Sequence, residues 1–308
     1  MARNAYISRL AMIELEHKTW ISGNLLKGQS IPQNGKSKLS HFLFVLRSYF
    51  RKPIKQQKLI AKFGKEEVEL KTNEKGHFSQ LVELPLPTDI RFYYQNQQIP
   101  VTEEYPSLFP NPETSIEVIS DLDDTVLLSH TASALKRIRN ILFLAPQKKE
   151  TILYTFHLMQ AFKDLKWRVH YLSKSESNLY QVIADFIDYH ELPKGVLLLS
   201  PHLQWNQLLK PNKGKDYKLK QLKELIRALP EKRFILLGDD TQKDMEIYTQ
   251  VIKEFESKIA MVFIRQTKLK ITEKQENMWN KLNATEVDAY YFDDEEEPWK
   301  AIEKIKTL

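Results

Sequence analysis

The order of apolar runs beyond residue 115 constrains the fold of this chain more than any other feature of its sequence. Five short apolar runs occur there together with three longer stretches of helical periodicity. Buried strands that alternate with helices build a parallel sheet whose two faces the helices cover. The apolar runs span 116–120, 168–173, 195–200, 233–238 and 258–265, and the helical stretches span 178–192, 217–229 and 244–256. This part of the chain is therefore predicted to be an α/β domain with a parallel sheet.

The chain before residue 115 follows a different pattern. Short runs of alternating apolar and polar residues, separated by turn-rich pieces, predict a small, mostly-β domain. These runs span 19–26, 67–72, 77–84 and 90–95. Charge changes at the same place, because residues 1–115 carry 16 Lys and Arg against 11 Asp and Glu, whereas residues 116–308 carry 30 against 29. We therefore expect two domains, residues 1–114 and residues 115–308.

Composition limits the chemistry that the chain can perform. Its 308 residues contain no cysteine, which excludes disulfides, thiolate metal sites and cysteine nucleophiles. A catalytic metal would therefore be held by oxygen or imidazole ligands. The strongly apolar stretches run to about ten residues, short of the roughly 20 needed to cross a bilayer, and the opening MARNAYISRL lacks the apolar core of a signal peptide. We expect a cytoplasmic protein.

Acidic residues gather where apolar runs end. Asp121 and Asp123 directly follow the run at 116–120, and Ser173 and Asp239 end or follow two other runs. In open parallel sheets, ligands bind beyond the carboxyl ends of the strands. One carboxylate there can attack phosphorus while a second transfers protons. Several carboxylates in one place also require a divalent cation, and oxygen ligands favour Mg²⁺.

The motifs that contain these residues resemble those of the haloacid dehalogenase superfamily. DLDDTV at 121–126 is similar to its DxDxT signature, and LLGDDTQKD at 236–244 is similar to its acidic GDxxxxD element. Ser173 matches the Ser or Thr that ends the second strand, and Lys218 matches the Lys that opens a later helix. From about residue 115 to 267 the chain further resembles the catalytic-domain family typified by the fungal actin-patch phosphatidate phosphatase, which has many bacterial members. This resemblance implies a Rossmann-like sheet with little or no cap, preceded by a β domain.

The resemblance also implies a role for each matching residue. Asp121 would be the nucleophile, forming an aspartyl-phosphate, and Asp123 would be the general acid and base. Ser173 and Lys218 would bind the phosphoryl oxygens. The implied ligands of Mg²⁺ are Asp121, Asp123, Asp239 and Asp244.

Three neighbouring features complete the expected site. Thr125 should support the loop by capping backbone amides. The chain has Glu176 and Ser177 where the family usually has Pro-Trp, and Asp240 and Thr241 where it usually has a Ser-Gly pair. Asp240 should point away from the side chain of Asp239.

Three functions fit these residues. The sequence leaves no room for a large cap, and an open site favours a phosphomonoester on a bulky substrate. We expect a Mg²⁺-dependent phosphatase of a lipid head group, phosphatidate or a similar one, and no stable nucleic-acid partner. The alternatives are a phosphatase of another bulky substrate, such as a nucleic-acid end or a phosphoprotein, and a non-catalytic membrane-associated scaffold. The four motifs argue against the scaffold, but the sequence does not separate the two kinds of substrate.

One strongly basic segment suggests how a lipid could be reached. Residues 36–62 contain eight Lys or Arg and no Asp or Glu. Within it, Leu39, Phe42, Leu43, Leu46 and Phe50 recur at helical spacing, which predicts an amphipathic helical insertion near 39–52. Such a helix can lie peripherally in an anionic membrane interface, or it can pack on its own domain and leave its basic face to attract anionic lipid. Both alternatives remain open.

Overall fold

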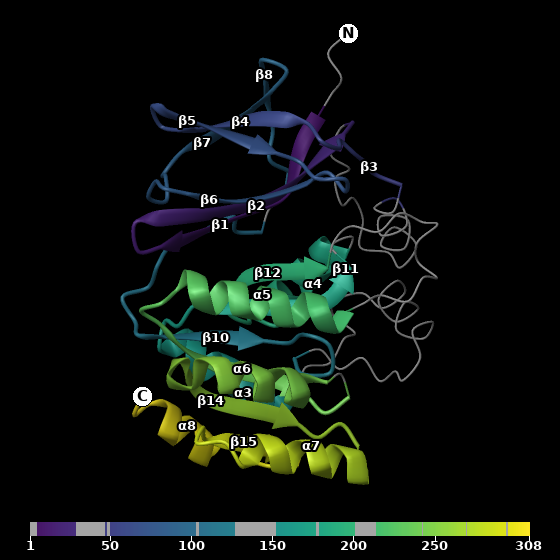
Figure 1. The fold of residues 1–308 in the computed structure, drawn as a ribbon, viewed down its shortest axis with the longest axis vertical. Helices are drawn as coiled ribbons and strands as arrows, with labels where there is room; N and C mark the ends of the chain where they lie inside the picture. The colour runs from purple at the N-terminus through teal and green to yellow at the C-terminus, as the bar shows by residue number, and fades with distance from the viewer. Residues whose placement is uncertain are drawn as a thin grey trace. The chain divides into compact units, whose positions relative to one another are not determined.

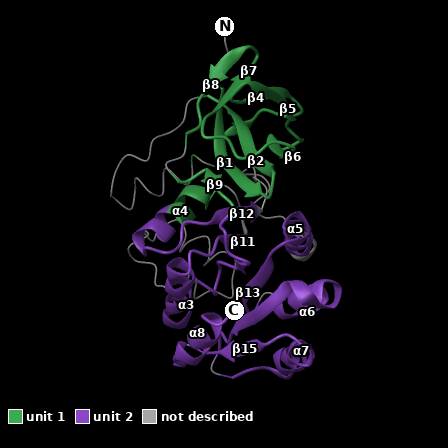
Figure 2. Ribbon diagram, turned by 90° about the vertical axis from the view of Figure 1, so that its left-hand side faces the viewer, with its two compact units in different colours: residues 1–111, 176–184, 201–210 green, residues 112–175, 185–200, 211–308 purple. Residues whose placement is uncertain are grey.

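The computed structural model describes residues 5–28, 47, 50–102, 105–126, 152–176, 179–200, 214–241, 243–268, 270–293 and 295–308. The chain divides into two compact units, which Figure 2 shows in green and purple. Unit 1 comprises residues 1–111, 176–184 and 201–210, and unit 2 comprises residues 112–175, 185–200 and 211–308. The predicted division into domains at 114/115 stays a prediction. Within the described residues, no helix is both long enough and apolar enough to cross a membrane.

Unit 1 contains two β-sheets (Figure 1). In the first, the order is β3-β2-β1-β9, with β6 also paired to β2, and in the second it is β5-β4-β7-β8. The strands of the first sheet are β1 (Ala5–Leu15), β2 (Lys18–Lys27), β3 (Lys52–Pro53), β6 (His77–Val82) and β9 (Leu108–Phe109). Those of the second are β4 (Lys58–Phe63), β5 (Glu66–Lys71), β7 (Ile90–Tyr94) and β8 (Gln97–Ile99). The expectation of a mostly-β N-terminal region is confirmed.

The core of unit 1 is formed by apolar side chains from both sheets. Ile21 and Leu25 of β2 are fully buried in the same cluster as Leu59 and Ala61 of β4. The alternating burial of β4 shows why this cluster forms, since every second residue of the strand is buried while its neighbours are partly or fully exposed.

The predicted helical insertion near 39–52 lies mainly outside the described residues. At its end, Lys52 and Pro53 pair with β2 as strand β3 and are not helical. Further along the basic segment 36–62, Lys58 and Lys62 lie on β4 and form ion pairs of 2.9 and 2.6 Å with Glu69 and Glu67 of β5. These two cationic charges are therefore already paired with carboxylates.

Unit 2 is built on a six-stranded sheet with the order β12-β11-β10-β13-β14-β15. Its strands are β10 (Ile116–Ser120), β11 (Val169–Glu176), β12 (Val196–Ser200), β13 (Arg233–Asp239), β14 (Ile259–Arg265) and β15 (Ala289–Phe292). The pairings of β10 with β11 and β13, of β13 with β14, and of β14 with β15 are all parallel. All five residues of β10 and all seven of β14 are buried, which explains why their sequences are mostly apolar.

Helices cover both faces of this sheet (Figure 2). Helices α5, α6 and α7 lie on one face, and α3 and α8 lie on the other. The helices are α3 (Leu153–Asp164), α4 (Tyr180–Tyr189), α5 (Gly214–Ala228), α6 (Asp244–Phe255), α7 (Glu273–Asn283) and α8 (Trp299–Ile305), with a 3₁₀ turn at Glu256–Lys258. The predicted α/β fold with a parallel sheet is confirmed.

A charged network lies buried within the sheet. Glu117 of β10 accepts hydrogen bonds from Arg168, at 2.7 and 3.1 Å, and lies 2.5 Å from Nε2 of His170 on β11. Glu117 and His170 are both fully buried. Burial alone would raise the pKa of Glu117, but His170 and Arg168 lower it below its usual value. The carboxylate is therefore ionised and compensated inside the protein.

We expect Glu117→Ala to lower the free energy of unfolding by about 3–5 kcal/mol, because it leaves a buried arginine without this partner. Urea unfolding of the full chain measures this loss. Glu256→Ala, at an exposed site, is the control and should change stability by less than about 0.5 kcal/mol. Equal losses in the two variants would contradict a stabilising role for the network.

Candidate active site

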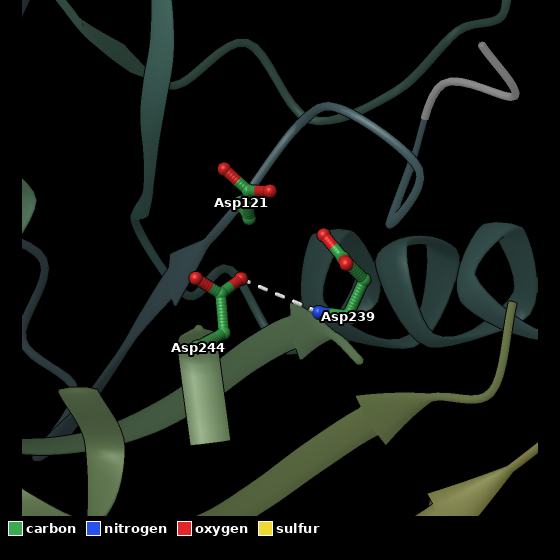
Figure 3. Close-up of side chains that lie close together, drawn as sticks. All are labelled: Asp121, Asp239 and Asp244. Atoms are coloured by element: carbon green, nitrogen blue, oxygen red, sulfur yellow. Dashed lines mark hydrogen bonds between the residues drawn. The ribbon is translucent and has the colours of Figure 1, made fainter. Parts of the chain in front are cut away.

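Three aspartates from three elements come together at the carboxyl ends of β10 and β13 (Figure 3). Asp121 follows β10, Asp239 ends β13, and Asp244 begins α6. One carboxylate oxygen from each lies within 4.8 Å of the others, and all three residues are fully buried. The parallel pairing of Ser120 with Leu237 places the two strand ends side by side. The sheet edge predicted from the sequence is therefore where these carboxylates meet.

Gly238 allows α6 to approach the end of β13 closely. A Cβ atom at this position would lie 2.6 Å from Oδ2 of Asp244, 2.8 Å from Cβ of Asp244 and 2.9 Å from Cε2 of Tyr248. Real side chains do not pack at such distances, so a larger residue would have to displace the start of α6. The close approach lets the Asp239 amide donate a 3.3 Å hydrogen bond to Oδ2 of Asp244 (Figure 3).

Lys218 of α5 supplies positive charge to this group. Its Nζ lies 3.1 Å from Oδ1 of Asp121 and 2.6 Å from Oδ1 of Asp244. Burial alone would lower the pKa of Lys218, but the charges of Asp121 and Asp244 raise it well above its usual value. Lys218 is therefore a buried, protonated ammonium group.

The group still has excess negative charge. Burial and the charges of Asp244 and Asp121 raise the pKa of Asp239 well above its usual value, although Thr241 donates to its Oδ1 from both the amide and the hydroxyl. Three carboxylates and one ammonium carry a formal charge of −2 when all are ionised. A divalent cation with oxygen ligands would neutralise that charge, so the residues present fit such an ion.

Asp123 and Ser173 form a second pair at the same edge. The Ser173 hydroxyl donates a 3.0 Å hydrogen bond to Oδ2 of Asp123, and both residues are buried. The acidic group that the described residues form contains Asp121, Asp239 and Asp244 but not the carboxylate of Asp123. The structure thus brings together three of the four predicted metal ligands and places Asp123 with the predicted phosphate-binding serine.

Of the predictions for residues next to the site, one is confirmed and one is wrong. Asp240 points away from Asp239, as expected, and accepts hydrogen bonds from Thr267 and Tyr291. The prediction for Thr125 was wrong, because within the described part of the chain its buried hydroxyl has no hydrogen-bond partner. Ser177 lies outside the described residues.

Two residues near the site were not predicted. Arg265 ends β14 at the same sheet edge, and its Nη1 donates a 2.8 Å hydrogen bond to the carbonyl of Asp124. Tyr248 of α6 donates a 2.7 Å hydrogen bond to the carbonyl of Leu237, and its ring centre lies 6.0 Å from Nζ of Lys218. A charged residue at the end of an otherwise apolar strand could have identified Arg265. A tyrosine on a helix with an apolar face gives no comparable signal.

Comparison with known proteins found similarities for the part of the chain that contains this sheet edge. Residues 116–266 match the protein-family model for the catalytic domain of phosphatidate phosphatase APP1. The chain is 24% identical over 221 residues to an uncharacterized protein of Schizosaccharomyces pombe, covering 68% of this chain and 35% of that protein. It is 24% identical over 171 residues to phosphatidate phosphatase APP1 of Saccharomyces cerevisiae, covering 54% of this chain and 28% of that protein. The chain thus spans about a third of the length of these relatives.

Among solved structures, the class C acid phosphatase of Bacillus anthracis with bound tungstate has 14% sequence identity and a TM-score of 0.34. The similarity covers 57% of this chain and 82% of that protein.

The close approach at Gly238 can be tested by substitution. We expect Gly238→Ala to lower the free energy of unfolding by about 1–3 kcal/mol, because the added methyl group overpacks the start of α6. Gly64→Ala is the comparison, since a Cβ there meets nothing within 4 Å and its cost comes from a left-handed φ of 61°. Urea unfolding measures both losses. An unchanged unfolding midpoint for Gly238→Ala would show that the contact is not tight.

Proposed function

We propose that this chain is a Mg²⁺-dependent phosphomonoester hydrolase of the haloacid dehalogenase type. The match of residues 116–266 to the family model for the catalytic domain of phosphatidate phosphatase APP1 supports this proposal. The observation that carries the proposal is the buried group of Asp121, Asp239 and Asp244 with Lys218 at its side. Its oxygen donors and excess negative charge suit a hard divalent cation together with a phosphate ester.

In this proposal Asp121 is the nucleophile. One of its carboxylate oxygens forms a bond to phosphorus while the bond from phosphorus to the ester oxygen breaks, which leaves an aspartyl-phosphate. Asp123 gives its proton to the leaving oxygen. Asp123 then takes a proton from the attacking water, whose oxygen displaces Asp121 and releases inorganic phosphate. The first carboxylate is thereby restored.

The surrounding residues orient these two carboxylates. The hydrogen bond from Ser173 restricts the carboxylate of Asp123. Lys218 lies close to Asp121 and would balance charge on the phosphoryl oxygens as it shifts in the transition state. Asp121, Asp239 and Asp244 would hold Mg²⁺, which would stabilise negative charge on the phosphoryl group.

We propose a lipid head group as the substrate, with phosphatidate as the leading candidate. The name of the matching family and that of the yeast relative support this choice. Peripheral contact of residues 36–62 with an anionic membrane belongs to the same proposal. Of that segment, Lys58 and Lys62 are already paired with Glu69 and Glu67, so the attraction would come mainly from its other basic residues.

Asp121→Asn should reduce hydrolysis of phosphatidate in vesicles to the uncatalysed background, because the amide is nearly isosteric but a poor nucleophile. Asp123→Asn should lower kcat by about 10²–10⁴-fold, the usual contribution of general acid and base catalysis. Asp188→Asn is the matched control, since this exposed aspartate of α4 pairs only at the surface with Lys194. The activity of all three variants is measured as the rate of phosphate release.

Two results would change these conclusions. Substantial activity of Asp121→Asn would exclude the covalent mechanism. Faster hydrolysis of 5′-phosphorylated oligonucleotides or phosphopeptides than of phosphatidate by the unmodified chain would exclude the lipid assignment while leaving the mechanism in place.

Removal of the metal should also abolish turnover. We expect excess EDTA to stop phosphate release and added MgCl₂ to restore it, because the carboxylates would otherwise repel one another and the substrate. KCl at equal ionic strength is the control for salt effects and should restore nothing. Full turnover in excess chelator would exclude the metal requirement.

A further inference from the structure

Asp240 is the residue directly after Asp239, but its carboxylate is bound by residues outside the acidic group. Its Oδ1 accepts hydrogen bonds from the amide of Thr267 at 3.1 Å and from the hydroxyl of Thr267 at 2.5 Å. Its Oδ2 accepts a 2.9 Å hydrogen bond from the hydroxyl of Tyr291 on β15. Only 4% of Asp240 is exposed. This buried carboxylate therefore joins the end of β13 to the segment after β14 and to β15.

The backbone of Asp240 is held as well. Its amide donates a 3.1 Å hydrogen bond to the carbonyl of Arg265, and its carbonyl accepts a 3.3 Å hydrogen bond from Nε2 of Gln275. Gln275 is itself fixed, because its Oε1 accepts a 2.9 Å hydrogen bond from the amide of Thr272 in the capping box of α7. Four polar groups of Asp240 are thus bound by β14, the segment that follows it, β15 and α7.

Arg265 connects this arrangement to the other acidic loop. While its carbonyl accepts the Asp240 amide, its Nη1 donates a 2.8 Å hydrogen bond to the carbonyl of Asp124. Asp124 adopts a left-handed φ of 58° in the loop that carries Asp121 and Asp123. Arg265 is 4% exposed, so these contacts are made inside the protein. The loops after β10 and β13 are therefore tied to one residue at the end of β14.

These ties oppose the electrostatic repulsion within the acidic group. Asp121 lies on the loop after β10 and Asp239 ends β13, directly before the other loop. Like charges at this distance favour separation of these two segments when no cation is bound. A loop that is already held in place loses less conformational freedom when its carboxylate binds a cation. Contacts that orient the ligands of a metal in this way commonly change its affinity by 10–100-fold.

We propose that Asp240 and Arg265 form a brace that sets the relative position of Asp121 and Asp239 for a divalent cation. Both are positioning residues that act from outside the acidic group. The brace rests on the proposed function only in that the same acidic group would bind Mg²⁺. What the brace adds is a higher affinity of that group for the ion.

The test removes one tie at a time without touching the acidic group. Tyr291→Phe deletes the hydroxyl that binds Asp240 and keeps the ring, which lies 5.1 Å from that of Trp279. Tyr290→Phe is the matched control, because this neighbour on β15 stacks on Phe263 at 5.0 Å and makes none of the brace contacts. Calorimetric titration of the full chain with MgCl₂ alone gives the Kd of each variant.

We expect Tyr291→Phe to weaken Mg²⁺ binding by about 10-fold and Tyr290→Phe to leave it unchanged. Asp240→Ala should weaken binding further, and Asp240→Asn should recover part of it because the amide oxygen can still accept from Thr267. When activity is measured as phosphate release, Tyr291→Phe should need a higher Mg²⁺ concentration to reach its half-maximal rate. Its kcat at saturating Mg²⁺ should equal that of the unmodified chain. A purely structural role would lower the unfolding temperature without changing Kd.

The outcomes separate the brace from the proposed function. Mg²⁺ binding that weakens in Tyr291→Phe, in a chain that hydrolyses no phosphomonoester, would support the brace and reject the function. An unchanged Kd in Tyr291→Phe and Asp240→Ala, with hydrolysis intact in the unmodified chain, would reject the brace alone. Absence of Mg²⁺ binding to the unmodified chain would reject both.

Discussion

Compensation of buried negative charge is the constraint on which this sheet edge depends. Asp121, Asp239 and Asp244 are fully buried within reach of one another, and Lys218 pairs with two of them. Carboxylates in such a setting are costly to ionise unless an opposite charge is close. Lys218 neutralises only part of the negative charge of the three carboxylates, and a divalent cation would neutralise the rest. The position of α5 is therefore as important to the site as the strand ends themselves, because it delivers the ammonium group.

Other features of unit 2 hold these three carboxylates close together. Parallel pairing of β10 with β13 brings the two acidic loops together, and the absence of a side chain at Gly238 lets α6 bring Asp244 to the same point. The sheet also contains the network of Glu117, Arg168 and His170, in which charge is balanced without any added ion. In one sheet, the charge of Glu117 is therefore balanced by protein side chains, whereas the acidic group at the sheet edge keeps excess negative charge that a cation would balance.

The sequence predicted most of the fold because buried parallel strands have continuous apolar sequences. It failed where that signal is weak. Strand β15 has only four residues, of which three are partly exposed, and β4 was hidden inside a strongly basic segment. Strand β1 was also missed, and its register is interrupted near Arg9, where φ is 60°. The candidate metal ligands Asp121, Asp239 and Asp244 could be found because each lies in a local motif. The contacts of Asp240 could not, since Thr267 and Tyr291 are 27 and 51 residues away along the chain.

The parallel pairing of β10 with β13 has a further consequence for how such a chain can vary over evolution. Successive side chains of a strand point to opposite faces, so loss or gain of one residue within β13 would turn Asp239 to the other face and move it by about 3.3 Å. Insertions and deletions should therefore be rare between Arg233 and Asp239, even where amino-acid replacements are tolerated. Strand β15, at the edge of the sheet, carries none of the three aspartates. Changes of length should accumulate in the segments that lead into it, and the sheet edge with its carboxylates should persist among relatives of quite different length.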